Sequence, residues 1–308
     1  MNMQIGIDLG GTKIEIICLK PNGEQVLRRR IPSPQGDYIK TIKTISEIVL
    51  SLKKLLNNSI SVGIGIPGSI SSSSGLVKNA NSTWLIGKPL EEDLTNTIGQ
   101  PIKLANDANC FILSECIDGA AKDAMVAFGV ILGTGVGGGI SVNKVILSGS
   151  NSITGEWGHN PLPWQSADEF EMIGKCYCGK IGCIETFLNG SALSKLHSNV
   201  ACGQIALSAK EINILLEKNN HQAKKTLRIY SSRLARSLSS VINLIDPDII
   251  VLGGGLSNIN LLYELVPDFW HSWVFSDQIK TKLVKNQHGD SSGVRGAAWL
   301  WSNKVNII

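Results

Sequence analysis

Three cysteines and one histidine lie close together in the middle of the chain, and this group has the composition of a zinc site. The four residues are His159, Cys176, Cys178 and Cys183. Structural zinc takes four ligands and favours thiolate and imidazole, so the set fits a closed Cys3His shell. Clustered cysteines are often small buried apolar residues. The ligand count, and the Gly179 and Gly182 that allow tight turns inside the cluster, favour the metal.

Two glutamates flank this cluster. Glu156 lies shortly before His159, and Glu185 follows Cys183 after one residue. A closed metal site folds the stretch back on itself, so we expect the two carboxylates to approach each other. Such a pair is suited to binding a polyhydroxylated ligand. His159 has a second ring nitrogen that remains an N–H donor when the first holds a metal.

A glycine turn near the N-terminus has the chemistry of a phosphate site. Asp8 ends a strand-like stretch and leads into Gly10, Gly11, Thr12 and Lys13. Small residues expose backbone N–H groups, the threonine offers a hydroxyl and the lysine a cation. Asp8 can hold Mg²⁺ directly or through water. The alternative is an ordinary glycine hairpin, and the spacing of a Walker A motif is absent.

A second glycine turn, Gly133-Thr134-Gly135, matches part of a dinucleotide-binding string that continues to Gly138. That reading requires a helix to open at these glycines. The residues that follow, Ile140–Ile146, instead have a strand–turn–strand pattern. We therefore expect a hairpin that binds a nucleotide phosphate, and we exclude a nicotinamide cofactor.

Asn106 and Asp107 lie where a strand-like stretch meets a helix. A carboxylate at a helix N-terminus stays ionised because the helix dipole favours its charge. Asp107 is either a plain helix cap or a general base that takes a hydroxyl proton, and the spacing leaves both open. Asn81 belongs to a stretch rich in amides and hydroxyls that is either a sugar-binding loop or a polar turn.

The elements that must position these residues form a repeating α/β pattern. Short β-branched strands run into glycines at Ile5–Gly11, Val62–Gly68, Phe128–Gly135 and Ile249–Gly255, as in sheets buried on both faces. Helices are expected from Asp37 to Leu56, from Asp107 to Gly119, and from Leu227 to Ile245. We expect an α/β protein of two domains with a cleft between them. Residues 1–120, completed by a C-terminal helix within 291–308, form the smaller domain, and residues 121–290 form the larger one.

Composition excludes several classes of protein. The 308 residues carry a net charge of only +4. The basic run Arg28–Arg30 has no interleaved aromatic residues, so we read it as a solvated face and expect no nucleic-acid partner. No apolar stretch is long enough to span a membrane. Dispersed cysteines indicate a reducing compartment, so we expect a cytoplasmic protein.

Together these motifs resemble the ROK family (repressors, open reading frames, kinases) of the actin-like ATPase superfamily. The resemblance covers the whole chain and includes Gly65-Ile66-Pro67-Gly68, Glu156-x-Gly158-His159 and Gly253-Gly254-Gly255. It implies two actin-like (ribonuclease H-like) domains and a kinase that uses ATP and Mg²⁺ to phosphorylate the 6-hydroxyl of a hexose. It implies that Asp107 is the base, and that the zinc ligands are the four residues above. The implied sugar ligands are Gly68, Asn81, Asn106, Asp107, Glu156, His159 and Glu185. The implied ATP-binding residues are Asp8, Gly10, Gly11, Thr12, Lys13, Gly133, Thr134, Gly135, Gly254 and Gly255.

Three stretches resemble the bacterial fructokinase (mannofructokinase) branch of the family: Val77–Leu85, Gly158–Trp164 and His288–Gly296. They imply phosphorylation of D-fructose, with mannose as a second substrate. The alternatives within the family are kinases of N-acetylglucosamine, N-acetylmannosamine or glucose. An alternative of another class is a sugar-sensing regulator without catalysis. The family resemblance also implies a homodimer.

Overall fold

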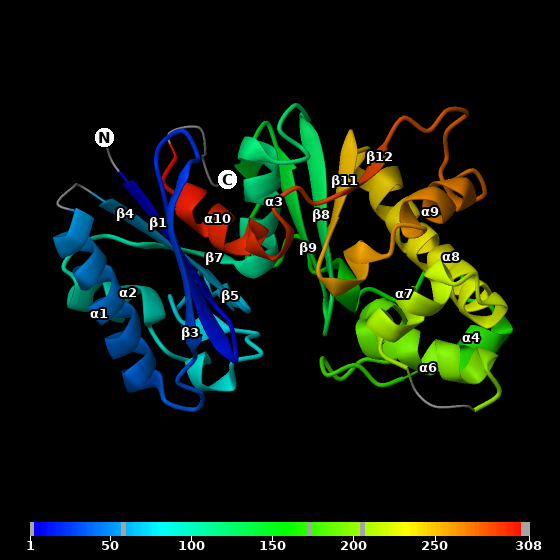
Figure 1. The fold of residues 1–308 in the computed structure, drawn as a ribbon, viewed down its shortest axis with the longest axis horizontal. Helices are drawn as coiled ribbons and strands as arrows, with labels where there is room; N and C mark the ends of the chain where they lie inside the picture. The colour runs from blue at the N-terminus through cyan, green and yellow to red at the C-terminus, as the bar shows by residue number, and fades with distance from the viewer. Residues whose placement is uncertain (1–2, 57–59, 172–173, 204–206, 303–308) are drawn as a thin grey trace. The chain divides into compact units, whose positions relative to one another are not determined.

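The computed structural model describes residues 3–56, 60–171, 174–203 and 207–302. The chain divides into two compact units, each with its own internal packing. Unit 1 comprises residues 1–123, 139–154 and 287–308, and unit 2 comprises residues 124–138 and 155–286. Both contain strands and helices (Figure 1). The domain boundaries predicted at residues 120 and 290 stay a prediction. Residues 303–308 of the predicted C-terminal segment lie outside the described residues.

Unit 1 is built on a five-stranded sheet with the strand order β3-β2-β1-β4-β7. Its elements are β1 (Met3–Leu9), β2 (Lys13–Leu19), β3 (Gln25–Pro32), α1 (Tyr38–Leu56), β4 (Ile60–Ile66), β5 (Ser69–Ile70), β6 (Val77–Lys78), η1 (Thr83–Leu85), α2 (Leu90–Ile98), β7 (Lys103–Asn106), α3 (Asp107–Asp118), η4 (Gly289–Ser291) and α10 (Ser292–Trp299). β1, β4 and β7 are parallel. Their carboxyl ends therefore share one edge, where Asp8 pairs with Gly65 and Ile66 pairs with Asn106.

The core of unit 1 consists largely of β-branched strand residues and the apolar face of α1. The helix predicted after Asp37 is confirmed, because Asp37 Oδ1 accepts a hydrogen bond from Lys40 N at 2.9 Å and caps it. The helix predicted from Asp107 to Gly119 is also confirmed, as α3.

Helix α10 packs directly on β1, β4 and α3 (Figure 1). Three glycines make this approach possible. A Cβ atom on Gly6 would lie 2.1 Å from Val294 O, and one on Gly63 would lie 2.0 Å from Ala297 O. A Cβ on Gly296 would lie 1.6 Å from Cys110 O. A larger side chain at Gly6 or Gly63 would force α10 away from the sheet, and one at Gly296 would force it away from α3.

All three arginines of the run Arg28–Arg30 are exposed, as predicted for a solvated face, and two of them also pair with a buried carboxylate. Glu15 on β2 is only 1% exposed, and its two carboxylate oxygens accept hydrogen bonds from Arg28 Nε and Arg30 Nε, each at 2.6 Å. A buried carboxylate requires such partners. Glu15 lies opposite Asp8 in the β1–β2 register and opposite Arg30 in the β2–β3 register. Cross-strand pairing therefore turns this part of the basic run into a clamp beside Asp8.

A second five-stranded sheet has the order β10-β9-β8-β11-β12. The remaining elements are β8 (Val126–Leu132), β9 (Val136–Val142), β10 (Val145–Ile146), η2 (Trp157–His159), α4 (Ala167–Glu171), α5 (Glu185–Leu188), α6 (Gly190–Val200), α7 (Ala209–Glu217), α8 (His221–Ile245), β11 (Ile249–Gly253), η3 (Gly255–Asn258), α9 (Leu262–Trp270) and β12 (Lys282–Lys285). β9 begins in unit 2 and ends in unit 1. The long helix α8 ends, as predicted, before Asp246, which adopts a left-handed φ of 41°.

The strand–turn–strand pattern predicted after the second glycine turn is confirmed. β9 and β10 are antiparallel, and Asn143 and Lys144 join them with φ of 51° and 63°. Two consecutive left-handed residues are typical of a tight two-residue hairpin. A strand rather than a helix follows Gly135, so the structure agrees with the exclusion of a dinucleotide fingerprint.

A buried charge network joins α4 to α8 in unit 2. Glu169 Oε1 accepts hydrogen bonds from Arg233 Nε at 2.8 Å and from Arg236 Nη2 at 2.6 Å. Burial raises the pKa of Glu169, but the hydrogen bonds from Arg236, Ser166 N and Arg233 outweigh it and lower the pKa to about 2. Arg236 Nη1 also donates to Trp164 O at 2.6 Å. The network thus anchors the segment that leads away from His159.

None of the helices within the described residues is both long enough and apolar enough to cross a lipid bilayer.

Candidate functional site

The first glycine turn joins β1 to β2. Gly10 N donates to Lys13 O at 3.0 Å and closes the turn, and a Cβ on Gly10 would lie 2.9 Å from that same carbonyl. Ser33 N donates to Thr12 O at 3.0 Å and holds the turn against the chain that follows β3. The predicted phosphate residues Gly10–Lys13 therefore form one closed turn that follows Asp8 after one residue, and their role in binding phosphate stays a prediction.

Asp8 lies in a concentration of negative charge. Burial, together with the nearby carboxylates of Asp107 and Glu15, raises its pKa to about 7. The positive charges of Lys13 and Arg30 lower the pKa of Asp8, but by less than burial and the two carboxylates raise it. A buried carboxylate beside two others is a chemically sound place for a divalent cation, because oxygen ligands are what Mg²⁺ prefers. The donor set at Asp8 therefore fits the metal that phosphate chemistry requires.

The structure separates the roles of Asn106 and Asp107. Asn106 is the N-cap of α3, and its Oδ1 accepts hydrogen bonds from Ala108 N at 2.9 Å and Asn109 N at 3.4 Å. Its Nδ2 donates to Gly68 O at 3.0 Å. The interpretation of Asp107 as the plain cap is therefore wrong, because Asn106 takes that role. Asp107 is the first residue of the helix, where the helix dipole favours its negative charge.

Gly68 and Asn81 complete the predicted sugar ligands of unit 1. Gly68 has a φ of 119°, and a Cβ there would lie 2.6 Å from Lys78 O, so only glycine fits beside the Asn106 amide. Asn81 is exposed and lies two residues before η1, whose N-cap is Ser82. The structure brings Asn106 and Gly68 together by hydrogen bonding, and Asn81 follows the short strand β6 that pairs with β5 beside Gly68.

The four predicted zinc ligands converge in unit 2. One ligand atom from each of His159, Cys176, Cys178 and Cys183 lies within 4.8 Å of all the others. The loop closes through hydrogen bonds from Gly179 N to Cys176 O and from Cys176 N to Lys180 O, both at 2.9 Å. Gly179 and Gly182 have φ of 88° and 80°, as their predicted turning role requires. One imidazole and three sulfurs at this spacing fit a tetrahedral zinc ion.

The two glutamates lie against this cluster in different ways. Glu185 is 8% exposed, and its Oε1 accepts from Cys176 Sγ at 3.7 Å while its Oε2 accepts from Val136 N at 3.0 Å. Glu156 is more exposed, and its Oε2 lies 3.9 Å from His159 Nε2. The metal loop therefore carries both carboxylates, and Glu185 also ties it to the residue after the second glycine turn.

That second turn and the predicted ATP-binding residues Gly254 and Gly255 lie together at the end of β8. Gly133 N donates to Gly135 O at 3.0 Å, and Gly190 N at the start of α6 donates to Gly133 O at 2.8 Å. A Cβ on Gly135 would lie 2.8 Å from Glu185 Oε2, so a larger residue at this position would displace that carboxylate. Gly254 has a φ of 79°, and a Cβ there would lie 2.3 Å from Leu132 O. Gly254 and Gly255 therefore approach the strand that leads into Gly133.

Sequence reasoning missed one residue of this group, Tyr177. Its hydroxyl lies 3.0 Å from His159 Nε2, and its ring packs edge-on against the imidazole with centroids 5.1 Å apart. Desolvation, together with the charges of Glu185 and Glu156, raises the pKa of Tyr177 to about 12. The only sequence signal was an aromatic residue placed between two metal ligands.

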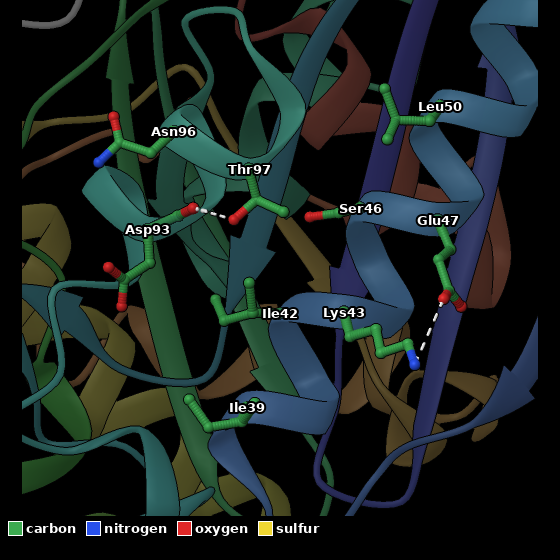
Figure 2. Close-up of a pocket in the computed structure, with 9 residues that line it drawn as sticks. All are labelled: Ile39, Ile42, Lys43, Ser46, Glu47, Leu50, Asp93, Asn96 and Thr97. Carbon is green, nitrogen blue, oxygen red and sulfur yellow. Dashed lines mark hydrogen bonds and ion pairs between the residues drawn. The ribbon is translucent and has the colours of Figure 1, made fainter.

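A cavity of about 480 Å³ lies elsewhere in unit 1, between α1 and α2 (Figure 2). Its wall is mostly apolar and includes Ile39, Ile42 and Leu50, with Asp93 and Thr97 on the facing helix. None of the predicted site residues lines it. The chemistry described above therefore belongs to the sheet edge of unit 1 and the metal loop of unit 2, and not to this cavity.

Comparisons with known proteins agree with this arrangement of motifs. The sequence profile of the ROK family matches residues 4–304. An N-acetyl-D-glucosamine kinase of Yersinia enterocolitica is 35% identical over 308 residues, covering 98% of this chain and all of the relative. A second, from Vibrio cholerae, is 37% identical over 303 residues, covering 97% of this chain and 99% of the relative.

Solved structures share the fold. A ROK hexokinase from Thermus thermophilus superposes with a TM-score of 0.82 at 24% identity and covers 96% of both chains. A ROK family glucokinase from Streptomyces griseus, in complex with glucose and AMPPNP, gives a TM-score of 0.77 at 22% identity and covers 97% of this chain and 99% of its own. At this level of identity the likeness establishes the α/β fold, as the sequence predicted.

Proposed function

This chain belongs to the ROK family and is a sugar kinase, and from that premise we propose that it transfers the terminal phosphoryl group of ATP to the 6-hydroxyl of N-acetyl-D-glucosamine. The observation that carries the kinase chemistry is the placement of Asp107. It is the first residue of α3, next to the N-cap Asn106, and it is close enough to Asp8 to raise the pKa of that carboxyl. An ionised carboxylate at this point can accept a proton from a sugar hydroxyl.

In the proposed reaction, Asp107 takes the proton of the 6-hydroxyl as its oxygen attacks the terminal phosphorus. The new bond joins the sugar oxygen to phosphorus, and the bond from that phosphorus to the bridging oxygen breaks, so that ADP leaves. Asn106, locked by the α3 backbone and by Gly68 O, fixes the start of the helix that carries the base. Phosphoryl transfer depends mainly on positioning and charge neutralisation, which the turn Gly10–Lys13 would provide.

Two metals belong to this proposal. Asp8 would hold Mg²⁺, which neutralises phosphate charge when bound. His159, Cys176, Cys178 and Cys183 would hold a structural zinc ion. The loop that these four ligands close would place Glu156, His159 and Glu185 where they can bind the sugar. Homodimer formation and a cytoplasmic location stay predictions.

The identity of the sugar is the point on which the earlier expectation changes. D-fructose was predicted, with N-acetylglucosamine as an alternative. Relatives that match nearly the whole chain at 35% and 37% identity are N-acetyl-D-glucosamine kinases, so they favour the alternative. Fructose remains the second candidate, because three stretches of this sequence resemble the fructokinase branch, among them Gly158–Trp164, which contains the proposed zinc ligand His159.

A panel of sugars tests the proposal directly. Purified protein would be incubated with ATP, Mg²⁺ and, in turn, N-acetylglucosamine, fructose, mannose, glucose and N-acetylmannosamine. ADP release gives kcat/KM, and mass spectrometry and NMR identify the phosphorylated position. We expect the highest kcat/KM with N-acetylglucosamine and phosphate on the 6-hydroxyl. The Asp107→Asn variant controls for contaminating kinases. A preference for fructose would refute the proposed acceptor, and sugar-independent ADP release alone would refute the kinase mechanism.

A further inference from the structure

Tyr177 is the residue between the first two cysteines of the metal loop, and its side chain is placed for a task other than core packing. The residue is 68% exposed. Its ring nevertheless has a defined position, because it packs at 84° against the His159 ring and its hydroxyl lies 3.0 Å from His159 Nε2. An exposed aromatic side chain held at its polar end is typical of a residue that meets a ligand.

A metal ion bound to His159 would fix the direction of this hydrogen bond. Nδ1 lies 3.5 Å from Cys176 Sγ and is therefore the nitrogen on the side of the metal ligands. With a metal at Nδ1, the imidazole would keep its proton on Nε2. Nε2–H would then donate to the Tyr177 hydroxyl oxygen, 3.0 Å away, and the phenolic proton would be available to a second acceptor.

The surroundings of that hydroxyl are those of the proposed sugar ligands. Glu156 Oε2 lies 3.9 Å from the same Nε2 atom, and Glu185 contacts Cys176, the residue before Tyr177. Both carboxylates are acceptors, so they serve the hydroxyl protons of a sugar but cannot donate to its oxygens. Among these side chains Tyr177 supplies a donor in a fixed position.

Resting on the proposed function, we propose that Tyr177 is a sugar-contacting residue that helps to determine specificity. Its hydroxyl accepts from His159 Nε2 and donates to an oxygen of the hexose. His159 then acts on the sugar through Tyr177, and not through a direct hydrogen bond from its own single N–H. The partner is a hexose that carries an acceptor oxygen at this place. Sugars without that acceptor leave the phenolic donor unpaired and bind less well.

Tyr177→Phe tests this assignment, because it removes the hydroxyl and keeps the ring. Loss of one neutral hydrogen bond is expected to raise the KM of the preferred sugar roughly 3- to 10-fold, with kcat changed less than about 3-fold. The KM values of less preferred sugars should rise less, so the difference in KM between the preferred sugar and the others should become smaller. Ile181→Ala is the matched control, since Ile181 is 67% exposed in the same loop and offers no hydrogen bond. Its KM values should equal those of the wild type.

Three results would overturn the assignment. One is an unchanged KM in Tyr177→Phe for every sugar. Another is a lower KM, because the hydroxyl would then compete with the sugar for His159. The third is loss of bound zinc or of thermal stability in the variant, which would make Tyr177 a structural part of the loop. Calorimetric titration of each sugar into both proteins gives a readout without turnover. A wild type that binds sugar but forms no product would refute the proposed function while leaving this inference testable.

Discussion

The buried network of Glu169, Arg233 and Arg236 gives a prediction whose size follows from the structure. Glu169→Gln removes the only negative charge that faces the two guanidinium groups in the described hydrogen bonds. The pKa of Glu169 falls from its ordinary 4.5 to about 2 in the folded protein. At about 1.4 kcal/mol for each pK unit, this difference corresponds to roughly 3 kcal/mol of stability at neutral pH. Breaking a buried ion pair costs a similar amount, about 3–5 kcal/mol.

Thermal unfolding at neutral pH measures the effect. A loss of about 3 kcal/mol in a domain of 150–250 residues lowers Tm by roughly 6–12 °C. Asp168→Asn is the matched control, because Asp168 is exposed on the same helix. Because the pKa of Glu169 is lower in the folded protein than in the unfolded chain, its ionised form stabilises the folded protein above about pH 4.5. This contribution disappears as the pH falls through about 2. The gap between wild type and variant should therefore narrow in acid. Equal Tm values at neutral pH would refute the reasoning.

Four further predictions concern the site and the packing of unit 1. Asp107→Asn should lower kcat by a factor on the order of 10² to 10⁴ with a much smaller change in sugar affinity, measured by ADP release and titration; near-normal turnover would remove it from the base role. Cys178→Ser or strong chelation should lower Tm and weaken sugar binding together, and metal analysis that finds no zinc in the untreated protein would contradict this. Because the pKa of Asp8 is raised to about 7, its protonated form stabilises the folded protein below about pH 4, and this stabilisation is lost as the pH rises through 7. Without Mg²⁺, Asp8→Asn should therefore have a higher Tm than the wild type at about pH 8. An equal Tm would count against the cluster of negative charge around Asp8. Gly296→Ala should cost more than about 3 kcal/mol or prevent folding, because its Cβ would lie 1.6 Å from Cys110 O; a normal urea midpoint would show that α10 can move.

Local patterns were enough to predict much of the fold. The strands that run into glycines are β1, β4, β8 and β11, and each is buried on both faces as the β-branched runs indicated. Asp37 caps α1, and the Asp246-Pro247 pair ends α8. These features depend on neighbours in the sequence, such as a capping side chain or a proline that cannot continue a helix.

Features that depend on distant residues were not predictable in the same way. Asn106 and Asp107 are both good capping residues, and Asn106 is held in the capping position by a hydrogen bond to the carbonyl of Gly68, in the bend between β4 and β5. The arginine run is solvated as expected, but its pairing with Glu15 was missed, because nothing in its own stretch shows that Glu15 lies opposite Arg30. Tyr177 contacts His159, which lies 18 residues earlier in the sequence, and the stretch around Tyr177 does not show this contact. In each case the missing information is the register between segments, which composition and periodicity do not contain.

The position of α10 has a consequence for synthesis on the ribosome. The first two parallel strands of unit 1, β1 and β4, emerge early, but the helix that covers them through Gly6 and Gly63 is translated only after residues 155–286. Until then an apolar sheet face of the nascent chain has no native cover, whereas the body of unit 2 is already complete. We therefore expect unit 1 to complete its fold last, and to expose until then an apolar surface of the kind that makes incomplete chains prone to aggregate.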